Sequence, residues 1–254
     1  MQGWYDEAET SLNEAARVYG ELVRGQPDAP PEDWQALGRS LASLGSTYTQ
    51  TSRAEKAEES QQQALKIFQR LTREHDQVPE YAYDLGRCHN ELGQTADRAG
   101  HLGAALAQFD KAIEIMKNAL DRGYAAARPS LMHARTDRAT TLARQGSHAR
   151  AAEEAEALAQ EEVDSGHVYN VACVYSNVSA AAGRDLKLSP VERTRLKERY
   201  ADRAMTFLRR AIAQGYRHPD AFKKDADLDS IRERDDFKKL VAELETQRKN
   251  SDVR

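Results

Sequence analysis

At four almost evenly spaced places in this sequence, a glycine or serine, both common in turns, is followed five residues later by an alanine. This repeat restricts the fold more than any other feature of the sequence. Seven residues after each such alanine comes a second apolar residue, which lies two helical turns later on the same face. The first alanines are 49, 48 and 46 residues apart, a period typical of stacked supersecondary units. The four pairs are Ala8 and Ala15, Ala57 and Ala64, Ala105 and Ala112, and Ala151 and Leu158.

Each repeated unit is predicted to be a helical hairpin. Small residues stand twelve positions before three of the alanines, at Gly45, Gly93 and Ala139, where a second helix can approach closely. Apolar residues recur with a helical period in the units, and no segment alternates with the period of a strand. Prolines between the units stand where a first helix begins. The sequence therefore predicts an all-α fold of antiparallel hairpins with elongated helices. The linkers are GQPDAPP (25–31), HDQVPE (75–80) and DRGYAAARPS (121–130).

We expect helical repeats over residues 1–217 and a C-terminal cap and tail over residues 218–254. The opening segment GWYDEAE has the pattern of a turn and the start of a second helix, so the first helix of that hairpin is expected before residue 1. We interpret the chain as excised from a longer protein, the alternative being a partner that covers the exposed face. The expected repeats are 1–26 (the second helix of a truncated hairpin), 31–75, 79–122, 129–163 and 166–215.

The last repeat is expected to carry an extended second helix. Ser189, Pro190 and Glu192 have the pattern of a capping box with proline at the first helical position, so this helix is predicted to start early. Residues 190–200 would then project from the repeats and offer an alternative binding surface.

A capping helix is expected at the C-terminus, with Asp235 or Asp236 as its N-cap. Its apolar stripe consists of Phe237, Leu240, Val241 and Leu244. The aspartates just before it imitate the first half of a calcium loop, but Ser230 replaces the glycine that the sharp turn needs and Asp236 stands in place of the bidentate glutamate. These aspartates are Asp225, Asp227 and Asp229, and we expect no metal there.

The pattern resembles the tetratricopeptide repeat (TPR) family. The residues that carry the resemblance most clearly are Leu41, Leu44, Gly45, Tyr48, Ala57 and Ala64, followed by Leu92, Gly93, Ala105, Phe109 and Ala112. The resemblance implies a right-handed α-solenoid whose first helices line a concave groove that binds a protein or peptide. The period is longer than the usual ~34 residues because each helix is expected to be about two turns longer.

A narrower resemblance concerns the C-terminal TPR regions attached to bacterial Ser/Thr protein kinases. It is carried by VYNVACVYS, YADRAMTFLRRAIAQGY and DLDSIRERDDFKKLVAEL. The resemblance implies a kinase domain upstream in a parent protein. This chain contains no glycine-rich phosphate loop, HRD or DFG motif, so we expect no enzyme activity from the chain itself.

The groove residues are implied by the TPR resemblance, position by position, on the first helix of each repeat. Arginine and asparagine can hold an extended peptide through charge-assisted and neutral hydrogen bonds. The set is Arg39, Ser43, Arg87, Asn90, Gln94, Arg98, His133, Arg144, Tyr169, Asn170 and Asn177. Each of these positions can equally be a solvated residue that binds nothing.

Composition excludes several other functions. A formal charge of −4 and a pI near 6.0 give no basic field for nucleic acid. No apolar run reaches the ~20 residues of a membrane span. The two cysteines stand inside helical patterns, which favours a reducing compartment, and a cytoplasmic location is expected. The seven histidines show no metal-ligand spacing, so neither metal nor cofactor is expected.

Two functions remain. The first is a protein–protein interaction scaffold that presents a polar concave groove to a peptide or protein. The second is an assembly element, in which the open N-terminal hairpin stacks on another copy of the chain or on the repeats expected before residue 1 and no peptide is bound.

Overall fold

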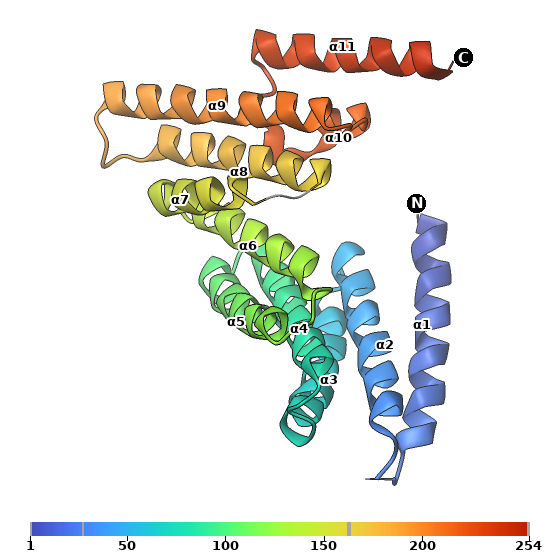
Figure 1. The fold of residues 1–254 in the computed structure, drawn as a ribbon. Helices are drawn as coiled ribbons and strands as arrows, with labels where there is room; N and C mark the ends of the chain where they lie inside the picture. The colour runs from blue at the N-terminus through green and yellow to red at the C-terminus, as the bar shows by residue number, and fades with distance from the viewer. Residues whose placement is uncertain (1, 27, 162–163, 253–254) are drawn as a thin grey trace. The chain divides into compact units, whose positions relative to one another are not determined.

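The computed structural model of this chain describes residues 2–26, 28–161 and 164–252. These residues form eleven α-helices and one 3-10 helix without any strand, which confirms the predicted all-α solenoid class (Figure 1). The elements are α1 (Gln2–Val23), α2 (Pro31–Gln50), α3 (Ala54–Glu74), α4 (Pro79–Arg98), α5 (Leu102–Asp121), α6 (Ala127–Arg144), α7 (His148–Ala159), α8 (Ser165–Arg184), α9 (Pro190–Ala213), α10 (Pro219–Lys224), η1 (Ala226–Leu228) and α11 (Asp235–Asp252).

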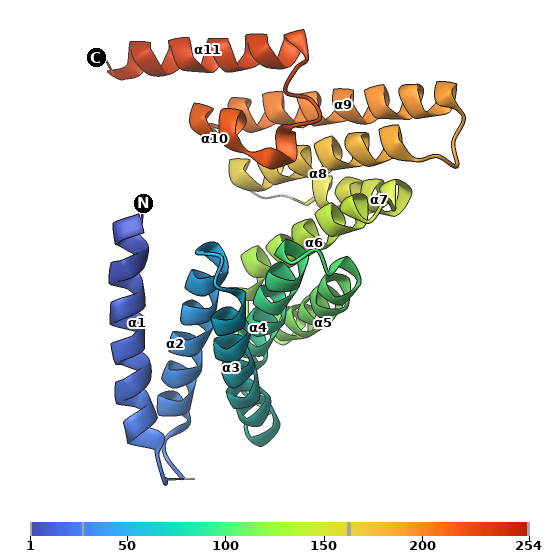
Figure 2. The same ribbon diagram turned by 180° about the vertical axis from the view of Figure 1, so that it is seen from behind.

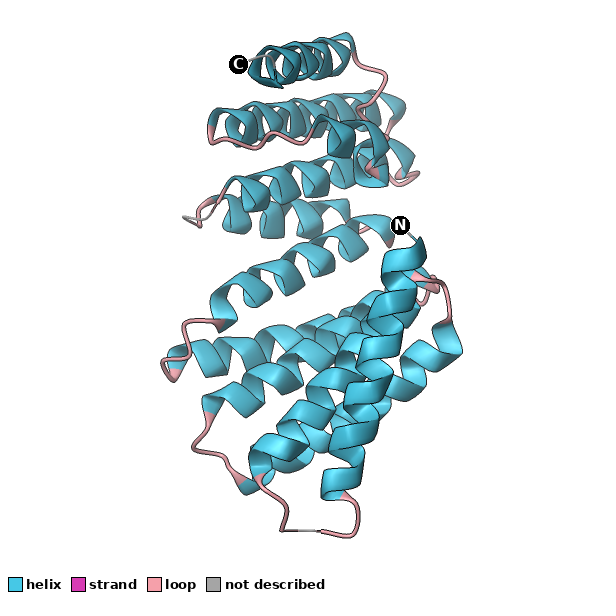
Figure 3. Cartoon of the chain, turned by 90° about the vertical axis from the view of Figure 1, so that its right-hand side faces the viewer, coloured by secondary structure: helices cyan, strands magenta, loops and turns pink. Residues whose placement is uncertain are grey.

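The chain folds into two compact units, Met1–Ala134 and Arg135–Arg254. In the first unit, α2 with α3 and α4 with α5 form antiparallel hairpins, which Figures 1 and 2 show from opposite sides. In the second unit, α8 and α9 form the longest hairpin. Figure 3 shows that short loops join the helices throughout the described residues. None of these described helices combines the length and apolar character needed to cross a membrane.

The small residues of the repeat admit the neighbouring helix, as predicted. A Cβ atom added to Gly93 would lie 2.5 Å from the ring of Phe109, and one added to Gly45 would lie 2.5 Å from Cγ of Gln61. These separations are too short for a real side chain, so glycine permits close helix packing at both positions. The repeated alanines of the later second helices are accordingly fully buried, namely Ala57, Ala64, Ala105, Ala112, Ala151, Ala204 and Ala211.

Helix α1 has one covered apolar face and one exposed apolar face. Leu12, Ala16 and Tyr19 pack against the core that α2 and α3 build. On the adjacent face Trp4 is 68% exposed and Leu22 is 47% exposed. The helix already begins at Gln2, so the expected turn at the start of GWYDEAE is absent from the described residues.

Helix α7 is short, and ion pairs add to the buried apolar residues of α6 and α7, which include Leu142 and Leu158. Arg135 Nε and Arg138 Nη1 donate to the carboxylate of Glu154 over 3.0 and 2.8 Å. Arg135 also lies 3.0 Å from Glu161, just after α7. These partly buried, charge-assisted contacts help to hold α6 against α7 and the residues that follow it.

Helix α9 starts early, as the capping box predicted. The Ser189 hydroxyl accepts from the Glu192 N–H, and the Glu192 side chain accepts from the Ser189 N–H over 3.1 Å. The N-terminal part of α9 is not isolated from α8, because the Ser179 hydroxyl donates to the Lys197 carbonyl over 2.8 Å. The expected projection is therefore partly packed on α8.

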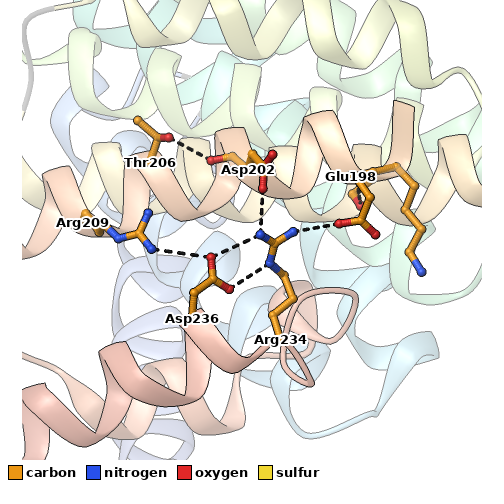
Figure 4. Close-up of polar contacts among 8 residues, drawn as sticks. Glu198, Asp202, Thr206, Arg209, Arg234 and Asp236 are labelled. Atoms are coloured by element: carbon orange, nitrogen blue, oxygen red, sulfur yellow. Dashed lines mark hydrogen bonds and ion pairs between the residues drawn. The ribbon is translucent and has the colours of Figure 1, made fainter. Parts of the chain in front are cut away.

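Two arginines, Arg234 and Arg209, link the C-terminal cap to α9 (Figure 4). Arg234 lies 3.0 Å from Glu198, 2.7 Å from Asp202 and 2.9 Å from Asp236. Arg209 approaches Asp236 from α9 at 3.5 Å. The Arg234 hydrogen bond lowers the pKa of Asp236. Both Asp235 and Asp236 lie in the first turn of α11, so neither precedes the helix as the expected N-cap would.

Candidate peptide-binding site

In the first unit, the expected groove residues of α2 and α4 differ widely in exposure. Ser43 and Gln94 are half-buried, Asn90 is buried, and Arg98 at the end of α4 is exposed. His133, on α6, is exposed. Helical spacing brings residues to one face, but packing of the neighbouring helix decides which of them a ligand can reach.

Arg39 is held by two carboxylates of α4. Its guanidinium lies 2.9 Å from Asp84 and 2.6 Å from Glu80. Asp84 also accepts from the Gln35 amide over 2.8 Å, and its side chain is only 1% exposed. Burial raises the pKa of Asp84, while Gln35 and Arg39 oppose that rise. Arg39 therefore stabilises the α2–α4 contact.

Arg87 is paired with Glu91 one turn later on the same helix. Their side chains lie 3.3 Å apart, and Glu91 is only 12% exposed. Burial raises the pKa of Glu91 to about 7, although Arg87 opposes the rise. The second carboxylate oxygen of Glu91 is buried without a hydrogen-bond partner among the described residues. The pair places a proton-sensitive carboxyl on the first-helix face.

A polar network that the repeat pattern does not predict joins α2, α3 and α4. Gln61, which is 1% exposed, donates to Thr95 over 3.0 Å, and the hydroxyls of Thr49 and Thr95 lie 2.9 Å apart. A cavity of about 410 Å³ lies elsewhere in the unit, beside α3, α4 and α5. Next to the network, a pocket of about 320 Å³ opens between the ends of α2 and α4. We call it the Arg98 pocket, since Arg98 supplies its charged side chain.

In the second unit, the expected groove positions of α8 are covered by the chain's own cap. The Tyr169 hydroxyl donates to Asp225 over 2.8 Å, and the Asn177 amide donates to Asp227 over 3.0 Å. Asn170, between them, is half-buried. Burial raises the pKa of Asp227, although the Asn177 hydrogen bond opposes it. Tyr169 and Asn177 therefore hold an internal acidic segment.

The same place contains a thiol and two carboxylates close together. Ligand atoms of Cys173, Asp225 and Asp227 lie within 4.8 Å of one another. The Cys173 thiol donates to Asp225 over 3.7 Å, and burial raises the pKa of that thiol well above its usual range. A protonated thiol that donates a hydrogen bond is not in the form that binds metal. Asp229, the third aspartate of the calcium-like spacing, is 69% exposed and pairs with Arg232.

A larger pocket of about 440 Å³ lies at the carboxyl ends of α6 and α8, within the second unit. We call it the tip pocket. Its polar lining includes the expected groove residues Arg144 and Asn177 together with Arg184 and Lys187, which the sequence pattern did not single out. The run RDLK, which ends α8 and begins the loop to α9, was the available signal for the latter two.

The two pockets share one feature: an arginine at the same position of the repeat lines each of them. Arg98 stands five residues after the small residue Gly93, and Arg144 stands five residues after Ala139. Both arginines are exposed at the last turn of a first helix, and each lines a pocket. The two units thus repeat the same local chemistry, an exposed guanidinium beside a small concavity.

Comparison with known proteins supports a TPR fold. Residues 36–118 match the family model described as tetratricopeptide repeat, a repeat that generally mediates protein–protein interaction. No curated protein matches the sequence. The crystal structure of BtubC (BKLC) from P. vanneervenii is similar with a TM-score of 0.60 and 17% identity, over 98% of this chain and 92% of that one. This likeness concerns the fold alone.

A crystal structure of a tetratricopeptide repeat protein from Parabacteroides merdae ATCC 43184 also aligns. It has a TM-score of 0.27 and 16% identity, over 94% of this chain and 98% of that chain. A score this low carries no structural argument.

Proposed function

We propose that this chain is a protein–protein interaction scaffold that binds extended acidic peptide segments on the polar face of its first helices. The observation that supports this most is the exposed arginine at an equivalent repeat position beside each pocket, Arg98 in one unit and Arg144 in the other. Guanidinium groups bind carboxylates with two parallel hydrogen bonds, which suits acidic side chains or a C-terminal carboxylate.

The expected groove residues enter this proposal with different roles. Arg98, Gln94 and Ser43 offer polar groups from the first unit. Arg39 is engaged with Asp84 and Glu80, so its contribution to a ligand is secondary to its role in packing. On α8, Tyr169 and Asn177 donate hydrogen bonds to aspartates of the cap, which supports carboxylate binding by polar residues of the first helices.

We further propose that the parent protein is larger than this chain and carries an enzyme such as a bacterial Ser/Thr kinase, which the repeats regulate or localise in the cytoplasm. The support is the resemblance of the last repeat and cap to the C-terminal regions of such kinases. This part can be tested by purifying the full-length parent protein. The purified parent should phosphorylate the protein from which a bound peptide derives.

Peptide binding can be measured directly with an array of immobilised acidic and neutral twelve-residue peptides. Wild-type protein should select the acidic ones, and Arg98→Ala should lower their signal severalfold. The matched control is Arg73→Ala on α3, which removes the same charge from a side chain that is 76% exposed and lies outside both pockets. Equal binding by all three proteins would contradict the proposal.

Self-association is the second candidate, and the exposed face of α1 favours it. Trp4, Val18 and Leu22 are 68%, 40% and 47% exposed and share one helical face. Ala8 and Ala15 are only partly buried there, whereas the equivalent alanines of the later second helices are fully buried. The exposed face of α1 therefore corresponds to the face that is buried by neighbouring helices in the later second helices.

Sedimentation equilibrium distinguishes the candidates. A dimer that becomes a monomer in Leu22→Glu would support assembly through α1. A monomer over the whole concentration range would favour the scaffold without self-association.

A further inference from the structure

Two cations of the tip pocket, Arg184 and Lys187, lie at the end of α8 and in the loop that follows it. Arg184 and Lys187 are exposed, and among the described residues no carboxylate lies within ion-pair distance of either. Arg144 lies on the same pocket and is exposed. The chain as a whole has a formal charge of −4, so this cluster of positively charged side chains is opposite in sign to the rest of the protein. Such a cluster attracts a partner of negative charge.

The acidic side chain that lines the pocket is already engaged. One Asp185 oxygen lies 3.2 Å from Nε2 of His148, and the other accepts from the backbone N–H of Lys187 over 2.9 Å. The Lys187 backbone bond, together with His148, lowers the pKa of Asp185. Asp185 therefore shapes the turn, while the cations around it point to a ligand of opposite charge.

An apolar side chain stands beside these cations. Leu186 is 85% exposed, and the first turn of α9 adds Val191, which is 78% exposed. Ala180 and Ala181 form an apolar part of the pocket wall. A ligand that satisfied the cations could therefore also bury apolar surface, at about 25 cal/mol for each Å² removed from water.

The turn that carries these residues is held in place before any partner binds. The Leu188 N–H donates to the Asp185 carbonyl over 3.2 Å, and the Ser189–Glu192 capping box fixes the chain at the start of α9. A turn ordered in advance loses little conformational entropy on binding, which favours affinity.

We propose that the tip pocket binds an acidic segment of a partner protein, with carboxylates on Arg144, Arg184 and Lys187 and an apolar side chain against Leu186. This inference deepens the proposed scaffold function and rests on it, and to the TPR-derived position Arg144 it adds Arg184, Lys187 and Leu186. A concave pocket with an adjoining exposed leucine suits a peptide better than the extended polyanionic surface of nucleic acid or of a membrane.

The probe is a fluorescein-labelled peptide of sequence EELDEL, compared with its neutral copy QQLNQL, by fluorescence anisotropy. The acidic peptide should bind with an affinity that falls as salt rises. Arg184→Ala with Lys187→Ala should weaken binding at least about tenfold, and Leu186→Ser about threefold. The matched control, Arg199→Ala with Arg210→Ala, removes two exposed charges from α9 outside the pocket and should leave binding nearly unchanged.

Three results would overturn the proposal: unchanged binding in the Arg184 and Lys187 variant, equal binding of the neutral peptide, or an equal loss in the control pair. Vesicles rich in phosphatidylserine and a single-stranded DNA serve as competing probes, and binding of either without binding of the acidic peptide would also overturn it. Loss of EELDEL binding in Arg98→Ala, with full binding kept in the Arg184 and Lys187 variant, would refute the tip pocket and leave the scaffold function standing. Failure of wild-type protein to bind the acidic peptide at about 1 mM would contradict both.

Discussion

Removal of Arg39 should destabilise the first unit, because it leaves the Asp84 carboxylate buried with one remaining donor. In the folded chain Asp84 is 1% exposed at its side chain and lies 2.9 Å from Arg39. Loss of a partner from a buried ion pair costs about 3–5 kcal/mol in general. Arg39 is 41% exposed and Gln35 continues to donate, so the expected loss for Arg39→Ala is smaller, about 2 kcal/mol.

The assay is urea unfolding followed by tryptophan fluorescence. The two tryptophans of the chain, Trp4 and Trp34, both lie in the first unit, so the signal reports that unit alone. Asp84→Asn keeps the size of the side chain and removes its charge. In the double variant, the loss from Arg39→Ala should therefore shrink by about 1 kcal/mol or more. Additive losses, or no loss in Arg39→Ala, would refute the assignment of Arg39 to packing.

Three further predictions concern packing, pH and the cap. Gly93→Ala should destabilise the first unit by about 1–3 kcal/mol because the new methyl group meets the ring of Phe109, whereas Gly103→Ala on α5 meets nothing within 4 Å and should be neutral or stabilising in the same unfolding assay. Burial raises the pKa of Glu91 to about 7 from ~4.3 in the unfolded chain, so the folded state binds the extra proton and wild-type stability falls as pH rises between these values. Glu91→Gln lacks this loss, and its advantage over wild type should grow by about 3 kcal/mol from pH 4.5 to 7.5. A constant difference would contradict the buried carboxyl. Arg234→Met should release α11, detected as faster amide hydrogen exchange in residues 235–244, with the α8 and α9 core unaffected.

The helical core could be predicted from the sequence because its signals are local and periodic. The spacing of Ala105 and Gly93 is a property of two neighbouring helices, and both positions pack as the spacing implies. The capping box at Ser189 involves residues within one turn, and it too forms as predicted.

The polar contacts could not be predicted in the same way, because they join residues that are distant along the chain. Asp225 returns to Tyr169 across 56 positions, and Asp84 meets Arg39 across 45. Periodicity gives the face on which a side chain lies but not the partner that reaches it from another helix. Gln61 shows the limit well, since it lies on a buried stripe that the pattern fills with apolar residues, and only the facing threonines explain it.

The location of a bound acidic peptide tests the account most directly. An EELDEL peptide with a photoreactive end group is crosslinked to the wild-type chain, and the modified residues are identified by mass spectrometry. The account predicts crosslinks in residues 95–99 beside the Arg98 pocket and in residues 184–188 beside the tip pocket. Crosslinks confined to the exposed face of α1, or spread over the second helices α3 and α5, would contradict it.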